Sequence, residues 1–294
     1  MARITRSRGV TLLELVVVIV LLGIIAAGSL AFLTRSTQSY VSTAARADLA
    51  STGRLALERI TRELRNALPN SVRTNASCIE FMPVIASGNY QDRRVTYSTG
   101  TTSAPLPVAG AGGAAVSFDA LAFLLAPQPG QNYYVAVYPL GPGAGNGDPY
   151  SGSDPGALFP YAGQSTAGLP SNVVRLTMDA AHRFSRGAPM RRLFVVGEPV
   201  SFCVSGTNLY RYTGYGVLSS QPTTASGALA GKQALLAQHI QLTDNGAPVT
   251  PFEYSPGTLY RTAVVRLDLR FMRQVQGGEE WARLSQEVQI RNVP

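Results

Sequence analysis

The chain has 294 residues, of which 45% are hydrophobic and 14% charged. This composition excludes an intrinsically disordered chain, and the length allows one large domain or two small ones in addition to an anchor. The formal net charge is +8, but Arg3, Arg6 and Arg8 all lie in the first nine residues, and without them the excess falls to +5. Such a small excess, with no interleaved aromatic residues, does not indicate a nucleic-acid-binding protein.

A long apolar segment follows the basic N-terminus. No residue from Leu15 to Thr34 carries a charge, and about 20 such residues cross the ~30 Å hydrocarbon core of a bilayer as a helix. The preceding arginines place the N-terminus in the cytoplasm, so we expect the chain after residue 34 to be exported. Glu14 stands at the head of this run, where a charge costs roughly 2.5 to 3.5 kcal/mol, so it is a candidate functional residue.

Two ordinary targeting segments explain only part of this pattern. A secretory signal has an apolar core of about 7 to 15 residues, and Ser29-Leu30-Ala31 has the small-x-small form of its cleavage site. Glu14, however, interrupts the place where that core should begin. An uncleaved signal anchor fits the length better but gives no reason for the order Gly-Val-Thr-Leu-Leu-Glu at residues 9–14.

The segment RGVTLLELVVVIVLLGIIAA, residues 8–27, resembles the leader and helix start of type IV pilins and type II secretion pseudopilins. The resemblance implies that a prepilin peptidase cuts after Gly9 and methylates Val10, where the family more often has Phe. It also implies that Glu14 docks the subunit by neutralising the terminal amine of a neighbouring chain. A buried ion pair of this kind is costly unless its geometry is good, so it fixes the register of assembly more than it adds stability.

Residues 35–66 continue with a helical period. Apolar or small residues recur three or four apart and define one face: Val41, Ala45, Leu49, Gly53, Leu57, Ile60, Leu64 and Leu68. Glu58 with Arg62, and Arg59 with Glu63, are spaced for i,i+4 pairs on the solvent side. Because Pro69 stops the pattern, we predict one unkinked helix of about 57 residues from Val10, roughly 85 Å long.

The rest of the chain has the character of β structure. CIEFMPVI at 78–85 predicts the start of a sheet, and the Gly- and Pro-rich stretch 98–170 is interpreted as loops with short strands such as QNYYVAVYPL. A hairpin turning at residues 205–208 follows. At the end, two segments alternate and predict an antiparallel hairpin with these residues facing inward: Leu259, Ala263, Val265, Leu267, Leu269, Phe271, Ala282, Leu284, Val288 and Ile290.

Cys78 and Cys203 are the only cysteines. An exported domain lies in an oxidising compartment, so we predict that they form a disulfide bond. In the chain-entropy model a loop of this length contributes roughly 4 to 5 kcal/mol.

No catalytic or metal-binding pattern is complete. His182 and His239 belong to no motif, and Gly163-Gln164-Ser165-Thr166-Ala167 lacks the final Gly of a nucleophile elbow. Asp148 and Asp154 lack the spacing and terminal Glu of an EF-type calcium loop. We therefore predict no enzyme, no cofactor and no metal. The pairs Arg93-Arg94 and Arg191-Arg192 are interpreted as solvated basic turns, and we do not expect nucleic acid as a partner.

The predicted fold is α+β and pilin-like, with a long N-terminal helix packed on a mainly antiparallel head. It comprises a cytoplasmic leader at 1–9, a transmembrane half-helix at 10–34, an amphipathic half-helix at 35–68 and a β-rich head at 69–294. SYVSTAARADLASTGRLALERITRELRNALPNSVR, IEFMP and QEVQIRNVP resemble MshO-like minor pilins of mannose-sensitive haemagglutinin-type pili, and the order of elements resembles J-type pseudopilins.

These resemblances imply an assembly subunit of a type IV pilus, held in the bacterial inner membrane with a periplasmic head before it enters a filament at the cell surface. The expected partners are other pilin or pseudopilin subunits, the prepilin peptidase and the inner-membrane assembly machinery. Two alternatives stay open. One is a minor pseudopilin of type II secretion, and the other is an adhesin or DNA-binding module carried at the tip of a pilus.

Overall fold

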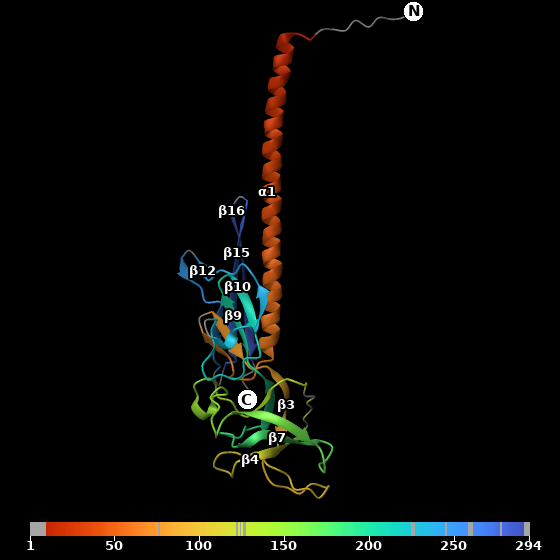
Figure 1. The fold of residues 1–294 in the computed structure, drawn as a ribbon, viewed down its shortest axis with the longest axis vertical. Coiled ribbons are helices and arrows are strands. Elements are labelled where there is room, and N and C mark those ends of the chain that lie inside the picture. Colours follow the sequence, from red (N-terminus) through yellow and green to blue (C-terminus); the bar gives the residue numbers. More distant parts are fainter. Residues whose placement is uncertain are drawn as a thin grey trace, which may run out of the picture.

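The computed structural model describes residues 10–75, 77–121, 123, 125, 128–224, 227–244, 246–257, 261–276 and 278–290. Its helix α1 spans Leu12–Arg65, which is about 81 Å at 1.5 Å per residue. The head lies at the C-terminal end of α1, and the N-terminal half of the helix projects away from it (Figure 1). The predicted α+β fold, a long N-terminal helix on a mainly antiparallel β head, is confirmed.

The helix ends four residues before Pro69, earlier than the sequence predicts. Asn66 is the C-cap, and its backbone N–H bonds back to the carbonyls of Glu63 and Leu64. The Asn66 side-chain amide then donates to the carbonyl of Val84 at 2.7 Å, and the Leu68 N–H donates to Met82 at 2.7 Å. The chain leaves the helix at this point because its backbone groups find partners in the sheet.

The predicted apolar face of α1 is confirmed in its C-terminal half. The buried residues of the helix are Ala45, Leu49, Gly53, Ala56, Leu57, Ile60, Thr61 and Leu64. Val41, predicted on the same face, is 37% exposed because it lies beyond the reach of the head. Of the two predicted i,i+4 pairs, the one between Arg59 and Glu63 is present.

Two antiparallel sheets pack with this face and form what we call the helix lobe. The first has the order β1 (Arg73–Asn75), β2 (Cys78–Phe81), β9 (Val200–Ser205), β10 (Asn208–Tyr212) and β11 (Gln233–Ala237). The second has the order β14 (Phe252–Ser255), β15 (Ala263–Val275) and β16 (Gly278–Ile290), and a short hairpin of β12 (Thr243–Asp244) and β13 (Ala247–Pro248) lies between them in sequence.

The predicted terminal hairpin is confirmed in β15 and β16. Val265, Leu267, Leu269 and Phe271 are completely buried, and Val288 and Ile290 are almost completely buried. Ala282 and Leu284 are partly buried against the same core. Leu259 lies outside the described residues. The predicted hairpin at 205–208 is also present, since Ser205 pairs with Asn208 where β9 turns into β10.

The remaining strands close into a barrel, which we call the barrel lobe. Its order is β3 (Val84–Tyr90), β4 (Ala115–Leu121), β7 (Val173–His182), β6 (Leu158–Ser165), β5 (Tyr133–Ala136) and β8 (Arg192–Gly197). Residues 98–170 supply three of these strands. The predicted strand in QNYYVAVYPL is confirmed as β5, whereas β4 and β6 were not predicted individually. Long Gly-rich connections surround these strands, and one of the connections holds the 3-10 turn η1 (Gly145–Gly147). A second such turn, η2 (Gly227–Leu229), precedes β11.

The barrel lobe is an insertion between two neighbouring strands of the helix lobe. The chain enters it after β2 and returns from it into β9, and these two strands pair directly with each other. Cys78 and Cys203 are opposite partners in that pairing and are joined by a disulfide, with 4.1 Å between their Cα atoms. The predicted disulfide therefore closes the neck through which the chain passes into and out of the barrel.

Candidate functional site

The first turn of α1 carries the residues that the sequence singles out. Thr11 is the N-cap, and its hydroxyl oxygen accepts a hydrogen bond from the backbone N–H of Glu14 at 3.2 Å. The order Thr-x-x-Glu is the pattern of a capping box, a signal that the sequence interpretation missed. Glu14 also lies where the helix dipole favours an anion. Val10 precedes the cap and is 67% exposed, whereas Gly9 lies outside the described residues.

The N-terminal half of α1 is not covered by any other part of the described chain. Every residue from Val10 to Val41 is exposed, and Ala45 is the first buried residue of the helix. The helix is long and apolar enough to cross a membrane, judged by length and composition. Burying an apolar side chain is worth about 1.5 to 3 kcal/mol. Such a continuous exposed apolar surface therefore has to be covered by lipid or by other chains.

The residues weighed as catalytic do not come together. His182 is completely buried in the barrel lobe, stacked on Phe159 at 4.2 Å between ring centres, and burial lowers its pKa although Asp154 opposes this. His239 is exposed in the helix lobe. Ser165 ends β6 and is not followed by a helix, so the nucleophile-elbow geometry is missing.

The two aspartates weighed as calcium ligands have structural partners. The carboxylate of Asp148 accepts hydrogen bonds from the backbone N–H groups of Gly143 and Tyr150, both at 2.8 Å. Asp154 accepts from the N–H of Arg183 at 3.1 Å. Among the residues that the structure describes, no group of three or more His, Cys, Asp or Glu is placed to hold a metal ion.

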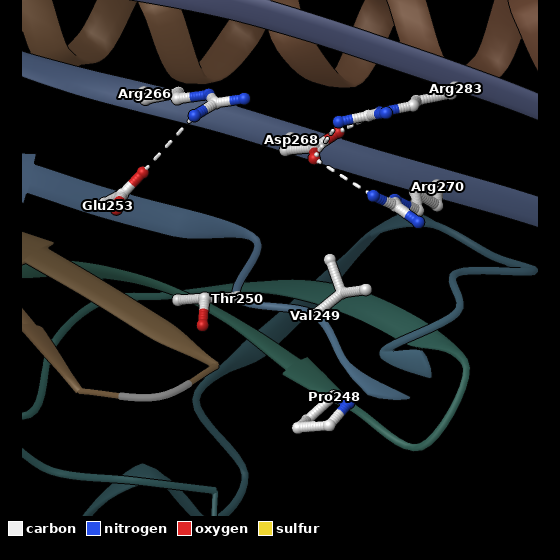
Figure 2. A pocket seen from close by; sticks show the side chains of 8 residues that line it. All are labelled: Pro248, Val249, Thr250, Glu253, Arg266, Asp268, Arg270 and Arg283. Carbon is white, nitrogen blue, oxygen red and sulfur yellow. Dashed lines mark hydrogen bonds and ion pairs between the residues drawn. The ribbon is translucent and has the colours of Figure 1, made fainter. Parts of the chain in front are cut away.

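The outer face of β14, β15 and β16 forms a charged hollow of about 310 Å³ (Figure 2). Arg283 donates two hydrogen bonds to the Asp268 carboxylate, at 2.9 and 2.8 Å. Burial alone would raise the pKa of Asp268, but the hydrogen bond and charge of Arg283, with Arg270 nearby, lower it below its usual value. Arg266 faces Glu253 at 3.7 Å, and Arg270 also pairs with Asp244. The charges of the three arginines and three acids cancel, so this face is a network of ion pairs that joins neighbouring strands.

Comparison with known families identifies the N-terminal segment alone. Residues 4–30 match a family model described as the prokaryotic N-terminal methylation motif. This match supports a type IV pilin-like family, whose members are structural subunits and not enzymes. No curated protein and no solved structure matches the chain significantly. The motif and the uncovered apolar helix together fit a pilin-type subunit that is anchored in a membrane and assembles with other subunits.

Proposed function

We propose that the chain is a minor pilin or pseudopilin that enters a filament through α1. The observation that carries this proposal is the exposed apolar N-terminal half of the helix, which overlaps the methylation motif at residues 4–30. Before assembly this half-helix lies in the bacterial inner membrane with its N-terminus in the cytoplasm and the head in the periplasm. In the filament the same surface packs against the helices of neighbouring subunits.

The first step of this function is processing of the leader. A prepilin peptidase cuts after Gly9 and methylates the new amine of Val10. The test is the intact mass and N-terminal residue of the protein purified from membranes, for which we expect a start at N-methyl-Val10. Gly9→Asp should leave the leader attached. A start near Phe32 would contradict the proposal, because it would mean cleavage of an ordinary signal at Ser29-Leu30-Ala31.

The second step is docking through Glu14, whose carboxylate neutralises the terminal amine of a neighbour. Glu14→Ala should leave cleavage intact and reduce incorporation into filaments severalfold, measured by immunoblotting sheared filaments against the membrane fraction. Thr11→Ala is the matched control, since it removes the helix cap and keeps the charge. Equal losses from both variants would assign Glu14 to helix capping, and normal incorporation of Glu14→Ala would exclude docking.

The proposed subgroup within the pilin-like proteins is based on the resemblance of short sequence segments. The segments 39–73 and 286–294 favour an MshO-like minor pilin of a mannose-sensitive haemagglutinin-type pilus over a J-type pseudopilin of type II secretion. Deletion of the gene should distinguish them, because the first predicts loss of pili and the second predicts loss of protein secretion with pili retained. An adhesin or DNA-binding tip module is the remaining alternative, and it predicts ligand binding by the head that is independent of filament assembly.

A further inference from the structure

Two arginine pairs that lie far apart in the sequence meet at one end of the barrel lobe. Arg93 and Arg94 follow β3, whereas Arg191 and Arg192 lie where β8 begins. Asp92 joins them, because its carboxylate lies 3.5 Å from Arg93 and 3.5 Å from Arg191. We call these five residues with Met190 the distal basic cluster. The sequence shows only two separate basic pairs, and the pairing of β3 with β8 makes them one surface.

The turns that carry the cluster are held firmly by the barrel. The backbone N–H of Tyr90 donates to the carbonyl of Arg191 at 2.8 Å, and the Asn89 amide donates to Met190 at 2.9 Å. On the other side the Ser103 hydroxyl donates to the carbonyl of Arg93 at 3.1 Å. A ligand therefore meets turns whose backbone is already ordered, which lowers the entropic cost of binding.

The cluster faces away from the membrane in which α1 is anchored. β3 begins at Val84, whose N–H donates to the carbonyl of Asn66 at the end of α1, and it runs away from there for seven residues, or about 23 Å. The barrel lies at the opposite end of the molecule from the N-terminus (Figure 1). The side chains are accessible, since Arg93 is 74% exposed and Met190 is 63% exposed.

Half of the net charge of the exported chain lies in this cluster. Residues 35–294 carry an excess of +6, which is the total of +8 less the three arginines of residues 1–9 and without the negative charge of Glu14. Four arginines and one aspartate give the cluster +3. Within the described part of the chain, Asp92 is the only acid paired with any of these four arginines. The cluster is thus a cationic surface with only one acid for four arginines, unlike the balanced ion pairs on β14, β15 and β16.

We propose that the distal basic cluster docks the head on an anionic phospholipid surface other than the membrane that holds α1. One guanidinium group can donate two parallel hydrogen bonds to two oxygens of a phosphate group. Each arginine near an anionic membrane surface strengthens binding to that surface about fivefold. The cluster lies on exposed segments that lead out of β3 and into β8. Met190 is the most exposed large apolar residue of the barrel lobe among those described, and it supplies an apolar contact at the acyl boundary. No aromatic residue of the cluster is available to stack on nucleic-acid bases.

The test uses the full chain and rests on the proposed membrane insertion of α1. Protein in phosphatidylcholine nanodiscs is presented with fluorescent vesicles that contain phosphatidylglycerol or phosphatidylcholine alone, at low and high salt. Recovery of the protein with the nanodisc establishes insertion separately from docking. We expect capture of the anionic vesicles only, and loss of capture as salt rises. The triple change Arg93→Gln, Arg94→Gln and Arg192→Gln should reduce capture at least tenfold.

Matched variants distinguish binding by the distal basic cluster from a nonspecific effect of the net charge of the protein. Arg54→Gln, Arg62→Gln and Arg65→Gln together make the same change in net charge on exposed positions of α1, and should leave capture unchanged. Asp92→Asn should raise capture about fivefold, a gain that misfolding would not produce. Met190→Ser should reduce it severalfold. Equal losses from the two triple variants, or retention of duplex DNA in place of anionic vesicles, would overturn the proposal.

Discussion

At the scale of single residues, the contact with the largest cost of burying a charge is the ion pair of Arg73 with Glu80, close to the disulfide. Glu80 is completely buried in β2, where Arg73 Nε lies 2.6 Å from its carboxylate and the Tyr215 hydroxyl donates to it at 3.0 Å. Burial raises the pKa of Glu80, and the charge and hydrogen bond of Arg73 oppose that rise. Arg73 is itself held over the Tyr150 ring, 3.6 Å from the ring centre. The Arg73 charge therefore offsets only part of the cost of burying this carboxylate.

Arg73→Met should therefore destabilise the head by about 3 to 5 kcal/mol, because it leaves a buried carboxylate without its cation. The loss should grow as pH rises. The raised pKa of Glu80 means that the folded state favours its protonated form. The free energy of unfolding contributed by this group is therefore fully present below the pKa that Glu80 has in the unfolded chain, and it is lost as pH rises through the pKa that Glu80 has in the folded chain. Urea denaturation between acid and neutral pH measures this effect. Adding Glu80→Gln should restore part of the stability and remove the pH dependence; a double variant as unstable as the single would contradict this account.

At the scale of elements, the packing of α1 on β15 and β16 depends on one glycine. A Cβ atom at Gly53 would lie 2.6 Å from Leu284 Cδ1 and 2.8 Å from Phe271 Cε2. Gly in a helix interior costs about 0.5 to 1 kcal/mol relative to Ala, so it is retained where two elements must approach closely. Ion pairs of Arg46 with Glu280 and of Arg273 with Asp48 join the same helix and hairpin nearer the N-terminal end of α1.

Gly53→Val should destabilise the head by about 1 to 3 kcal/mol, because the added side chain overpacks the contact between α1 and the hairpin. Thermal unfolding followed by near-ultraviolet circular dichroism in detergent measures the change. Gly28→Val is the control, since no atom lies within 4 Å of the Cβ position at Gly28. A Gly53 variant that melts like the control would show that the helix and hairpin separate easily.

At the scale of the whole molecule, the head is two lobes with separate cores joined by a smaller one. The helix-lobe core and the barrel core share no residue, and a third cluster joins Leu68 and Met82 to Ala136, Leu158 and Val196 of the barrel lobe. The disulfide closes a loop with a sequence separation of 125 that contains the entire barrel. Its effect on stability therefore depends on whether the lobes unfold together.

Replacing Cys78 and Cys203 together by Ala should lower the free energy of unfolding by about 4 to 5 kcal/mol if the whole head unfolds at once. If the barrel stays folded while the helix lobe opens, the effective loop is shorter and the loss is smaller. Urea titrations with probes in each lobe distinguish these cases, and we expect a single shared transition because the third core joins the lobes. A loss near zero would contradict any bracing by the disulfide.

The sequence by itself determined the parts whose signal is local. The order Gly-Val-Thr-Leu-Leu-Glu before an uncharged run indicates a prepilin-type N-terminal segment, in agreement with the family model that matches residues 4–30. The 3.6-residue and two-residue periods identify the buried faces of α1 and of the terminal hairpin. Only the tertiary structure decided that residues 98–170 help to close a barrel, that Glu80 is buried against Arg73, and that two arginine pairs form one surface. The barrel and the arginine surface depend on pairing between strands far apart in the sequence, such as β3 and β8. Arg73 and Glu80 are neighbours in the β1–β2 hairpin, but β2 also pairs with the distant strand β9 on its other side. Side-chain periodicity shows which face of a strand is buried but not which strand lies beside it, because strand partners are chosen by packing over the whole chain.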